Sequence, residues 1–289
     1  MKVLFFGYGG IAARALDLLH DRGDEIAAVV THRDDPSEAR WFTTPAEIAQ
    51  AHGWTTIYSG ETPAGALTAL AAAQRPDLIL SVFYRELLPE AVLQAARLAA
   101  LNLHPSLLPA YRGRAPINWV LVNGERLTGV TLHHMTRRAD AGDIVGQREL
   151  AVGARETALT LYRRIESAGT ALLAELLPLV AAGAAPRRPQ DHARATTFGR
   201  RRPEDGCIDW RWPAERIDRL VRAVAPPWPG AFFDAGGTRV FIEEGEPGEP
   251  LPASGAVPPG AIRRDADGVL IAAADRWFRV RAARGLNGA

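Results

Sequence analysis

Compact apolar runs alternate with segments of helical periodicity over the first hundred residues. The apolar runs, which we expect to be buried strands, are 2–7, 25–31, 77–83 and 101–103. Helices are expected at 12–20, at 66–74, around 89–98 and after Thr44, a capping residue followed by Pro45 and then by Glu47. Such alternation, with strands of continuous apolar residues, is typical of a parallel α/β sheet covered on both faces.

The pattern changes after Ala115. A helix is expected at 116–122, and alternating apolar positions predict strands at 128–135 and 143–150. A long stretch of leucines and alanines predicts a helix at 157–182, which Pro178 is expected to kink or to end.

The stretch 184–206 is rich in proline, arginine and glycine and has little apolar periodicity, which is typical of a linker. A helix is expected beyond it at 213–224. Short strands bounded by turn residues follow at 230–234, 238–243, 269–274 and 277–281. The organisation expected is therefore a catalytic domain at 1–190, a linker at 191–206 and a smaller β-barrel domain at 207–289.

Composition narrows the class of protein. The 289 residues are 47% hydrophobic and 23% charged, as in ordinary globular proteins, and the formal net charge of +1 gives no general electrostatic attraction for nucleic acid. The single cysteine, Cys207, allows no disulfide within the chain and no cysteine zinc site. No uncharged apolar run reaches the roughly 18 residues of a membrane span, so a soluble cytoplasmic protein is expected.

A glycine-rich turn follows the first strand. Gly7, Gly9 and Ala12 satisfy the loose dinucleotide-binding pattern G-x-G-x-x-A. The acidic residue that would meet a ribose is expected about 20 residues further on, and Asp34 comes late for that role. A dinucleotide site and a tight strand-to-helix turn that needs small residues both remain open from this pattern.

Two other polar clusters carry alternative interpretations. His133 and His134 lie in an alternating strand and point to opposite faces, so they cannot hold one metal ion together; one is expected to be buried and the other exposed or functional. The run 200–202, three arginines after Gly199, is either a solvated part of the linker or a phosphate clamp, in which Arg200 and Arg201 would contact the substrate.

Asn102, His104 and Asp140 are the most informative polar residues. Asn102 and His104 are two positions apart at a strand end and project in the same direction, and Asp140 lies in a turn after the next strand. Ligands of α/β sheets bind at such strand ends. An amide, an imidazole and a carboxylate are suited to proton transfer and oxyanion stabilisation. Ser106 is a less favoured candidate nucleophile, because adjacent positions do not align a hydroxyl with the ring of His104.

These residues lie in motifs of a known family. The stretch LNLHPSLLPAYRGRAPINWVLVNGE, followed by TGVTLHHMTRRADAGDIVGQ, resembles the folate-dependent formyltransferase family. The pattern Asn-x-His-Pro-Ser-Leu-Leu-Pro-x-Tyr-Arg-Gly with a later Asp-x-Gly-Asp is highly specific for that family. The resemblance implies a Rossmann-like formyltransferase domain followed by an OB-like C-terminal domain, with a glycine turn that belongs to the fold and binds no NAD.

The resemblance also implies roles for individual residues. The catalytic amide would be Asn102, the general acid/base His104 and its carboxylate partner Asp140, which is expected to raise the pKa of His104. The co-substrate would be N10-formyltetrahydrofolate, and no metal ion is implied. Its expected contacts are Glu86, Leu87, Leu88, Arg114, Thr136, Arg137, Arg138, Ala139 and Asp140.

One branch of the family is the most similar. Its members formylate UDP-4-amino-4-deoxy-L-arabinose in the lipid A modification that gives polymyxin resistance. The resemblance runs from Met1 to about Phe233 and becomes faint beyond Thr238. The shared stretches are THRDDP, SVFYRELL, RGRAPINWVLVNGE, TTFGRRRPEDG and RAVAPPWPGAF.

The amine that accepts the formyl group has three candidates: a nucleotide-linked amino sugar, methionyl-tRNA or another small amine. The tRNA-directed branch typically carries a basic insertion after the second strand, whereas the segment 31–50 is short and mixed in charge. Because tRNA binding needs many phosphate contacts, the sugar nucleotide is favoured. A non-catalytic binding protein is disfavoured because Asn102, His104 and Asp140 are all present.

The branch that acts on the arabinose nucleotide continues into a decarboxylating dehydrogenase domain, and this sequence ends at Ala289. The chain is thus either a freestanding enzyme or a piece of a bifunctional one. A freestanding enzyme would serve the same lipid A pathway, with a dehydrogenase on a separate chain as a functional partner, or it would act on a different sugar.

Overall fold

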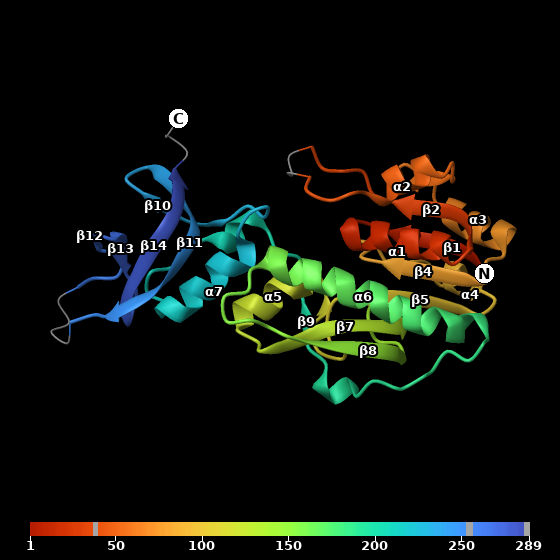
Figure 1. Ribbon diagram of the computed structural model, residues 1–289. Helices are drawn as coiled ribbons and strands as arrows, with labels where there is room; N and C mark the ends of the chain where they lie inside the picture. Colours follow the sequence, from red (N-terminus) through yellow and green to blue (C-terminus); the bar gives the residue numbers. More distant parts are fainter. Residues whose placement is uncertain (37–39, 253–256, 286–289) are drawn as a thin grey trace. The chain divides into compact units, whose positions relative to one another are not determined.

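The computed structural model describes residues 1–36, 40–252 and 257–285, and it divides into two compact units (Figure 1). Unit 1 contains residues 1–113, 127–151 and 163–198, and unit 2 contains residues 114–126, 152–162 and 199–289. The chain therefore passes between the units several times, which differs from the predicted division at 190 and 206. In the described part of the chain, no helix is long and apolar enough to cross a membrane.

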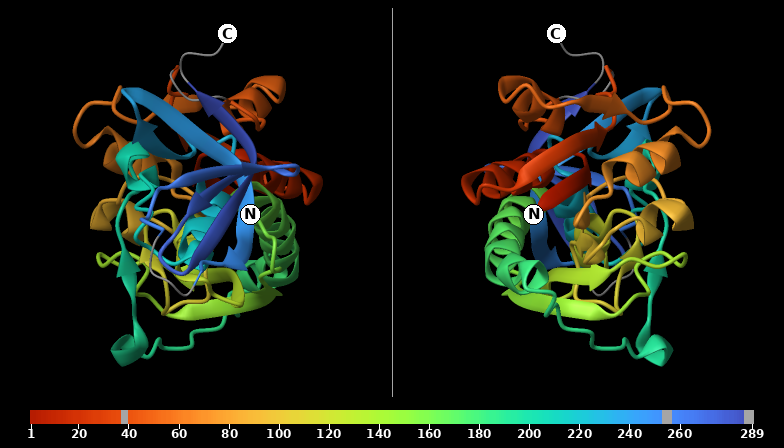
Figure 2. Two further views of the ribbon diagram at one scale, coloured as in Figure 1. Left: turned by 90° about the vertical axis from the view of Figure 1, so that its left-hand side faces the viewer. Right: turned by 90° about the vertical axis from the view of Figure 1, so that its right-hand side faces the viewer.

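Unit 1 is built on a seven-stranded sheet with the strand order β3-β2-β1-β4-β5-β7-β8, seen from two further sides in Figure 2. The strands are β1 (Lys2–Gly7), β2 (Glu25–Thr31), β3 (Thr56–Tyr58), β4 (Leu78–Val82), β5 (Ala99–His104), β7 (Leu127–His134) and β8 (Ile144–Ala151). Strands β1 to β5 pair in parallel, β7 runs antiparallel to β5, and β8 runs antiparallel to β7. The predicted α/β class is confirmed, and the short strand β3 was not predicted.

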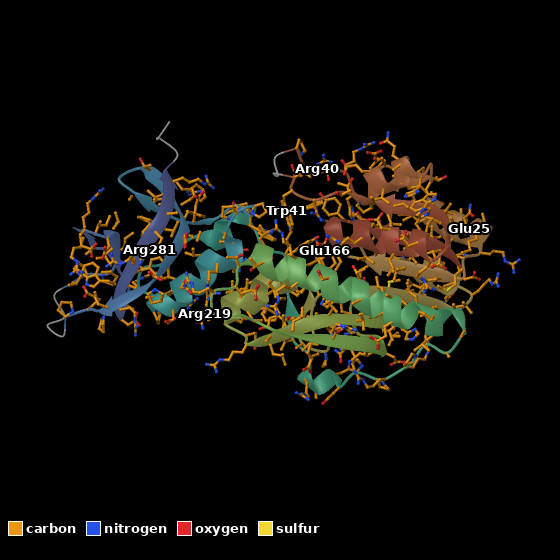
Figure 3. All side chains as sticks on the ribbon, in the orientation of Figure 1. Glu25, Arg40, Trp41, Glu166, Arg219 and Arg281 are labelled. Atoms are coloured by element: carbon orange, nitrogen blue, oxygen red, sulfur yellow. The ribbon has the colours of Figure 1, made fainter. Side chains whose placement is uncertain are left out.

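Helices cover both faces of this sheet. They are α1 (Gly10–Asp21), α2 (Pro45–Ala51), α3 (Ala66–Gln74), α4 (Glu90–Gln94) and α6 (Ala158–Ala181), which enters unit 1 at Arg163. Leu4 and Phe6 of β1 form an apolar cluster with Ala71 of α3 and Val92 of α4. Helices α1 and α6 are joined by an ion pair of 3.1 Å between Arg14 and Glu166, the latter labelled in Figure 3.

Local sequence explains the start of α2 but not the end of α6. The predicted capping box is present at α2: the Thr44 hydroxyl accepts from the amide of Glu47, and the Glu47 carboxylate accepts from the amide of Thr44. Pro178 lies inside α6, which continues as a helix to Ala181. The helix therefore spans almost the predicted range 157–182, and of the two expectations for Pro178, a kink or an end, the end is not observed.

The alternation of side chains along β5 places the polar residues. A Cβ atom at Gly169 of α6 would lie 2.9 Å from Leu103, so Leu103 faces α6, while Ala100 packs in the cluster that contains α3 and α4. Because successive strand residues point to opposite faces, Asn102 and His104 share the face of Ala100. The sequence-based prediction that these two side chains point the same way is consistent with this arrangement.

The chain after α6 returns along unit 1. Arg188 and Ile144 exchange two backbone hydrogen bonds of 2.8 and 3.0 Å, and β9 (Thr197–Phe198) pairs with β6 (Arg112–Gly113). We call residues 186–198 the return segment; it includes the short helix η1 (His192–Arg194). Backbone pairing orders this segment, although its composition is that of a linker.

Unit 2 combines two helices with a five-stranded antiparallel sheet in the order β10-β11-β14-β13-β12. Its elements are α5 (Pro116–Asn123), η2 (Pro203–Gly206), α7 (Ala214–Val224), β10 (Ala231–Ala235), β11 (Thr238–Pro250), β12 (Ile262–Asp265), β13 (Gly268–Ala272) and β14 (Arg276–Gly285). The side chain of Asn118 donates to the backbone of Ala223 at 2.7 Å and joins α5 to α7. The predicted β structure of the C-terminal part is confirmed as an antiparallel sheet, and its closure into a barrel stays a prediction.

The close approach of α6 to the sheet depends on Gly169. A side chain at this position would meet Leu103 at 2.9 Å and Ile11 at 3.1 Å. We therefore expect Gly169→Leu to lower the free energy of unfolding by about 1–3 kcal/mol, measured by urea denaturation, because the core must be overpacked. The matched control, Ser167→Leu on an exposed position of the same helix, should change it by less than about 0.5 kcal/mol. A stability equal to wild type in Gly169→Leu would contradict this packing.

Candidate active site

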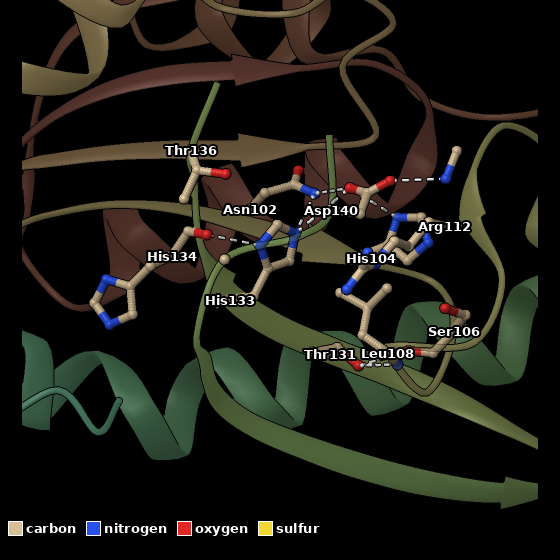
Figure 4. A network of polar contacts seen from close by, with 12 residues as sticks. Asn102, His104, Ser106, Leu108, Arg112, Thr131, His133, His134, Thr136 and Asp140 are labelled. Carbon is tan, nitrogen blue, oxygen red and sulfur yellow. Dashed lines mark hydrogen bonds and ion pairs between the residues drawn. The ribbon is translucent and has the colours of Figure 1, made fainter. Parts of the chain in front are cut away.

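Asn102, His104 and His133 meet on one face of the sheet (Figure 4). Asn102 and His104 come from β5, and His133 of β7 is the register partner of Asn102. The Asn102 Nδ2 atom lies 3.1 Å from the Nε2 atom of His133. Asp140, in the loop between β7 and β8, reaches the same place, so the structure brings the three predicted catalytic side chains together.

The carboxylate of Asp140 is the centre of this group. Its Oδ1 atom lies 3.5 Å from each of three nitrogens: Nδ1 of His104, Nε2 of His133 and Nδ2 of Asn102. Its Oδ2 atom accepts a hydrogen bond of 2.8 Å from the backbone amide of Gly113. The side chain is only 12% exposed, so these groups replace most of the water that a free carboxylate would have.

Both residues of the hydrogen bond between Asp140 and Gly113 have a positive backbone φ angle. Asp140 has a φ of +52°, in the left-handed region that non-glycine residues seldom occupy. Gly113 has a φ of +93°, and a Cβ atom there would collide with the carbonyl oxygen of Phe198. Only glycine therefore presents its amide to Asp140 at this point without moving β9.

The hydrogen bonds of His104 determine which ring nitrogen carries hydrogen. Its Nε2 atom lies 2.8 Å from the carbonyl oxygen of Tyr111, and a carbonyl oxygen only accepts. The Nε2 atom therefore bears the hydrogen. In the neutral ring, Nδ1 has the free lone pair and faces Asp140. The basic atom of the site is thus Nδ1 of His104.

Burial lowers the pKa of His104 below its ordinary value of 6.5, and the attraction of Asp140 and the bond to Tyr111 offset this only in part. Asp140 raises the pKa of His104, as expected, but burial has the larger effect and the net shift is downward. The sequence pattern does not show how completely the ring is buried. Burial also tends to raise the pKa of Asp140, but attraction to His104 and contacts with His133 and the Gly113 amide lower it well below 3.8. At neutral pH the carboxylate is ionised and His104 is neutral.

His133 is a site residue whose role the sequence left open. Its Nδ1 atom lies 2.9 Å from the carbonyl oxygen of His134 and therefore carries hydrogen, and its Nε2 atom lies 3.1 Å from Nδ2 of Asn102. His134 points away, with Nε2 3.1 Å from the carbonyl oxygen of Pro186. The two rings diverge as expected, but both are buried, so neither is the exposed histidine that the pattern allowed.

The residues expected to contact the co-substrate differ in exposure and in their partners. Leu87 is 70% exposed after β4, Leu88 packs against the core, and Glu86 accepts a hydrogen bond of 2.8 Å from Ser59. In the loop before Asp140, the hydroxyl of Thr136 donates to the carbonyl oxygen of Arg138 at 2.9 Å.

Three further residues are expected to contact the co-substrate. Arg137 is 3.6 Å from Glu90, and Ala139 directly precedes Asp140. Arg114 belongs to unit 2, immediately before helix α5.

Two of the remaining candidates, Ser106 and Arg201, have structural partners. Ser106 is fully buried and donates to the carbonyl oxygen of Ala110 at 2.7 Å, so it is not a nucleophile in this arrangement. Arg200 is exposed, whereas the guanidinium of Arg201 lies 4.7 Å from the ring centre of Trp119 and donates to the carbonyl oxygen of Asp205. Among the residues described, no group of three or more histidine, cysteine or acidic side chains is arranged to hold a metal ion.

Comparison with known proteins identifies the family. A family model described as formyl transferase matches residues 1–177, and a second, described as formyl transferase, C-terminal domain, matches residues 201–287. The chain belongs to the formyl transferase family. It is therefore an enzyme that transfers formyl groups, and the resemblance found in the sequence is confirmed at that level.

Solved structures show the same fold. An N-formyltransferase from Helicobacter canadensis, in complex with folinic acid and dTDP-3-aminofucose, is 17% identical with a TM-score of 0.74, over 98% of this chain and 100% of that one. WlaRD, a sugar 3N-formyl transferase with dTDP and 5-N-formyl-THF, is 16% identical with a TM-score of 0.70, over 100% of this chain and 99% of that one.

A third match is to a longer protein. HypX from Aquifex aeolicus, in complex with tetrahydrofolic acid, is 22% identical with a TM-score of 0.68. The match covers 99% of this chain and 44% of HypX, so the chain spans less than half the length of that protein. At these identities the likeness to solved structures shows the fold.

The electrostatics of the site give a prediction for His104. Its imidazole, followed by NMR, should titrate with a midpoint below 6.5, because burial disfavours the charged ring. Asp140→Asn removes the negative charge that favours the imidazolium ion, and should lower the midpoint further. The matched control, Asp143→Asn in the same loop, should leave the midpoint unchanged. A midpoint that rises in Asp140→Asn would contradict the assigned electrostatics.

Proposed function

We propose that the enzyme transfers the formyl group of N10-formyltetrahydrofolate to the amine of a nucleotide-linked amino sugar, with UDP-4-amino-4-deoxy-L-arabinose as the first candidate. The observation that carries the proposal is the enclosed group of a neutral imidazole, an ionised carboxylate and an amide at His104, Asp140 and Asn102. Each has a task in moving a formyl group between two nitrogens.

The base is His104. An amine that attacks a formyl carbon must lose a proton, and the Nδ1 lone pair of the neutral ring can accept it. The imidazolium ion that forms faces Asp140 at 3.5 Å, which stabilises the new charge. The same Nδ1 proton can then be given to the nitrogen that departs. His104 therefore begins the reaction as a base and becomes an acid only after the first proton transfer.

Asn102 is proposed to stabilise the oxyanion that forms when the amine attacks the formyl carbon. Its Nδ2 atom has one contact of 3.1 Å with His133 and a second of 3.5 Å with Asp140. The second contact is long for a hydrogen bond, so that N–H can turn toward an oxygen that becomes negative. The bond to His133 keeps the amide oriented for this purpose.

The surroundings fit a folate. N10-formyltetrahydrofolate would supply an activated formyl carbon, and its ring system needs apolar cover together with hydrogen-bond partners. The exposed side chain of Leu87, the carboxylate of Glu86 and the loop 136–140 offer both kinds of group. The relatives solved with tetrahydrofolic acid, folinic acid and 5-N-formyl-THF support this co-substrate.

The acceptor proposal rests on similarity and charge. Relatives of the same fold were solved with dTDP-3-aminofucose or dTDP, and the stretches shared with the arabinose branch favour a UDP sugar. Arg200 is exposed and is proposed to contact the phosphates, whereas the side chain of Arg201 is occupied by Trp119. Guanidinium groups suit phosphate oxygens.

Charge also disfavours tRNA as the acceptor. In the segment between β2 and α2, of which residues 37–39 lie outside the described residues, Arg33 is paired with Glu61 and Arg40 lies 2.6 Å from Glu47. Arginines neutralised in this way add little to phosphate binding. With a net charge of +1, the chain lacks the excess of cations that a tRNA surface requires.

A panel of acceptors tests the proposal. Purified enzyme with N10-formyltetrahydrofolate is supplied with UDP-4-amino-4-deoxy-L-arabinose, dTDP-linked amino sugars or methionyl-tRNA, and the formylated product is measured by mass spectrometry. The kcat/KM for a nucleotide sugar should exceed that for methionyl-tRNA by about a hundred-fold or more. A preference for methionyl-tRNA would overturn the acceptor proposal.

Variants tie the activity to the site. His104→Ala and Asp140→Asn should lower kcat by about 100- to 10,000-fold on every acceptor, because each removes part of the proton transfer. Asp143→Asn, in the same loop, should stay within about two-fold of wild type. Near-wild-type turnover in His104→Ala would contradict the assignment of His104 as the base.

A further inference from the structure

A buried cation lies next to the amide that binds Asp140. Arg112, the neighbour of Gly113 in β6, is only 2% exposed. Its Nη2 atom donates to Gln190 Oε1 at 2.5 Å and lies 2.9 Å from Nδ1 of His192. Within the part of the chain that the structure describes, its Nε and Nη1 atoms have no hydrogen-bond partner. A cation with so few partners is costly to bury, so the contact with Gln190 is important to it.

Gln190 lies in the return segment and is itself 7% exposed. Its Nε2 atom donates to the carbonyl oxygen of Asp140 at 2.9 Å and to that of Gly142 at 2.6 Å. Because carbonyl oxygens only accept, the amide must turn its nitrogen to the loop and its oxygen to Arg112. Both hydrogens of the amide and its oxygen are therefore engaged.

These contacts form a closed ring of four residues: Asp140, Gly113, Arg112 and Gln190. The Gly113 amide holds the side chain of Asp140, Arg112 is covalently joined to Gly113, Gln190 binds Arg112, and Gln190 also holds the backbone of Asp140. Asp140 has a left-handed backbone, which persists only where surrounding contacts impose it. The ring supplies such contacts on both sides of the residue.

We infer that Gln190 is a positioning residue for formyl transfer, which acts by fixing Asp140 relative to His104. The inference rests on the proposed function of that site. Gln190 touches neither reacting group. It holds the Asp140 loop through two carbonyl oxygens and connects that loop to the strand whose amide binds the carboxylate. Displacements of about 1 Å in such arrangements cost large factors in rate.

The decisive variant is Gln190→Glu. A carboxylate at this place still accepts from Arg112, so the buried cation keeps a partner, but it has no hydrogen to give to the carbonyl oxygens of Asp140 and Gly142. We expect a folded protein in which kcat falls by about ten-fold or more while the KM for the acceptor stays within about three-fold. Arg188→Ala, on an exposed neighbour whose side chain contacts Gln147, is the matched control and should keep wild-type kcat.

A double-mutant cycle separates positioning from a merely structural role. If Gln190 acts through Asp140, the double variant Gln190→Glu/Asp140→Asn should be no more than about two-fold slower than Asp140→Asn alone. Two losses that multiply would overturn the inference. So would a folded Gln190→Glu variant with wild-type kcat.

A second readout does not depend on turnover. In Gln190→Met, which is neutral and of similar size, the loop loses its hydrogen bonds and the carboxylate can move away from His104. The NMR titration midpoint of His104 should then fall below that of wild type, since Asp140 favours the charged ring. An unchanged midpoint would contradict the inference even if no acceptor in the panel were formylated. Failure of the panel with a lowered midpoint would contradict the proposed function instead.

Discussion

An almost enclosed negative charge is the constraint on which the site depends. The Asp140 carboxylate is 12% exposed and ionised, and a charge in that setting is tolerated only where polar groups replace its water. Strand β5 supplies Asn102 and His104, β7 supplies His133, and β6 supplies the Gly113 amide. The pairing of β5 with β7, and the turn that returns the chain from β7, therefore serve this carboxylate as well as the core.

The same enclosure explains how one imidazole can act first as a base and then as an acid. Burial keeps His104 neutral at neutral pH, which provides the lone pair that an attacking amine requires. The adjacent carboxylate has a strongly lowered pKa, so it stays charged while the ring gains and loses its proton. The bond from Nε2 to Tyr111 fixes the ring and its tautomer, and the exchange is confined to Nδ1.

Much of the fold and the centre of the site follow from local sequence. Apolar runs predict the parallel strands, the Thr44–Glu47 capping box predicts the start of α2, and spacing by two places Asn102 and His104 on one face. Other features depend on contacts between distant segments. Gln190 forms hydrogen bonds with Asp140, 50 residues away in the sequence, and with Arg112, 78 residues away. The periodicity of a sequence does not predict such pairs. The direction of the His104 pKa shift depends on burial, which a residue pattern does not give.

The central claim is that His104 is neutral at neutral pH, with its hydrogen on Nε2 and its basic lone pair on Nδ1 facing Asp140. The ring ¹⁵N chemical shifts of His104 in the wild-type enzyme at pH 7 test this most directly. The account predicts one hydrogen-bearing nitrogen, Nε2, and one bare nitrogen, Nδ1. Two hydrogen-bearing nitrogens, or a hydrogen on Nδ1 alone, would contradict it.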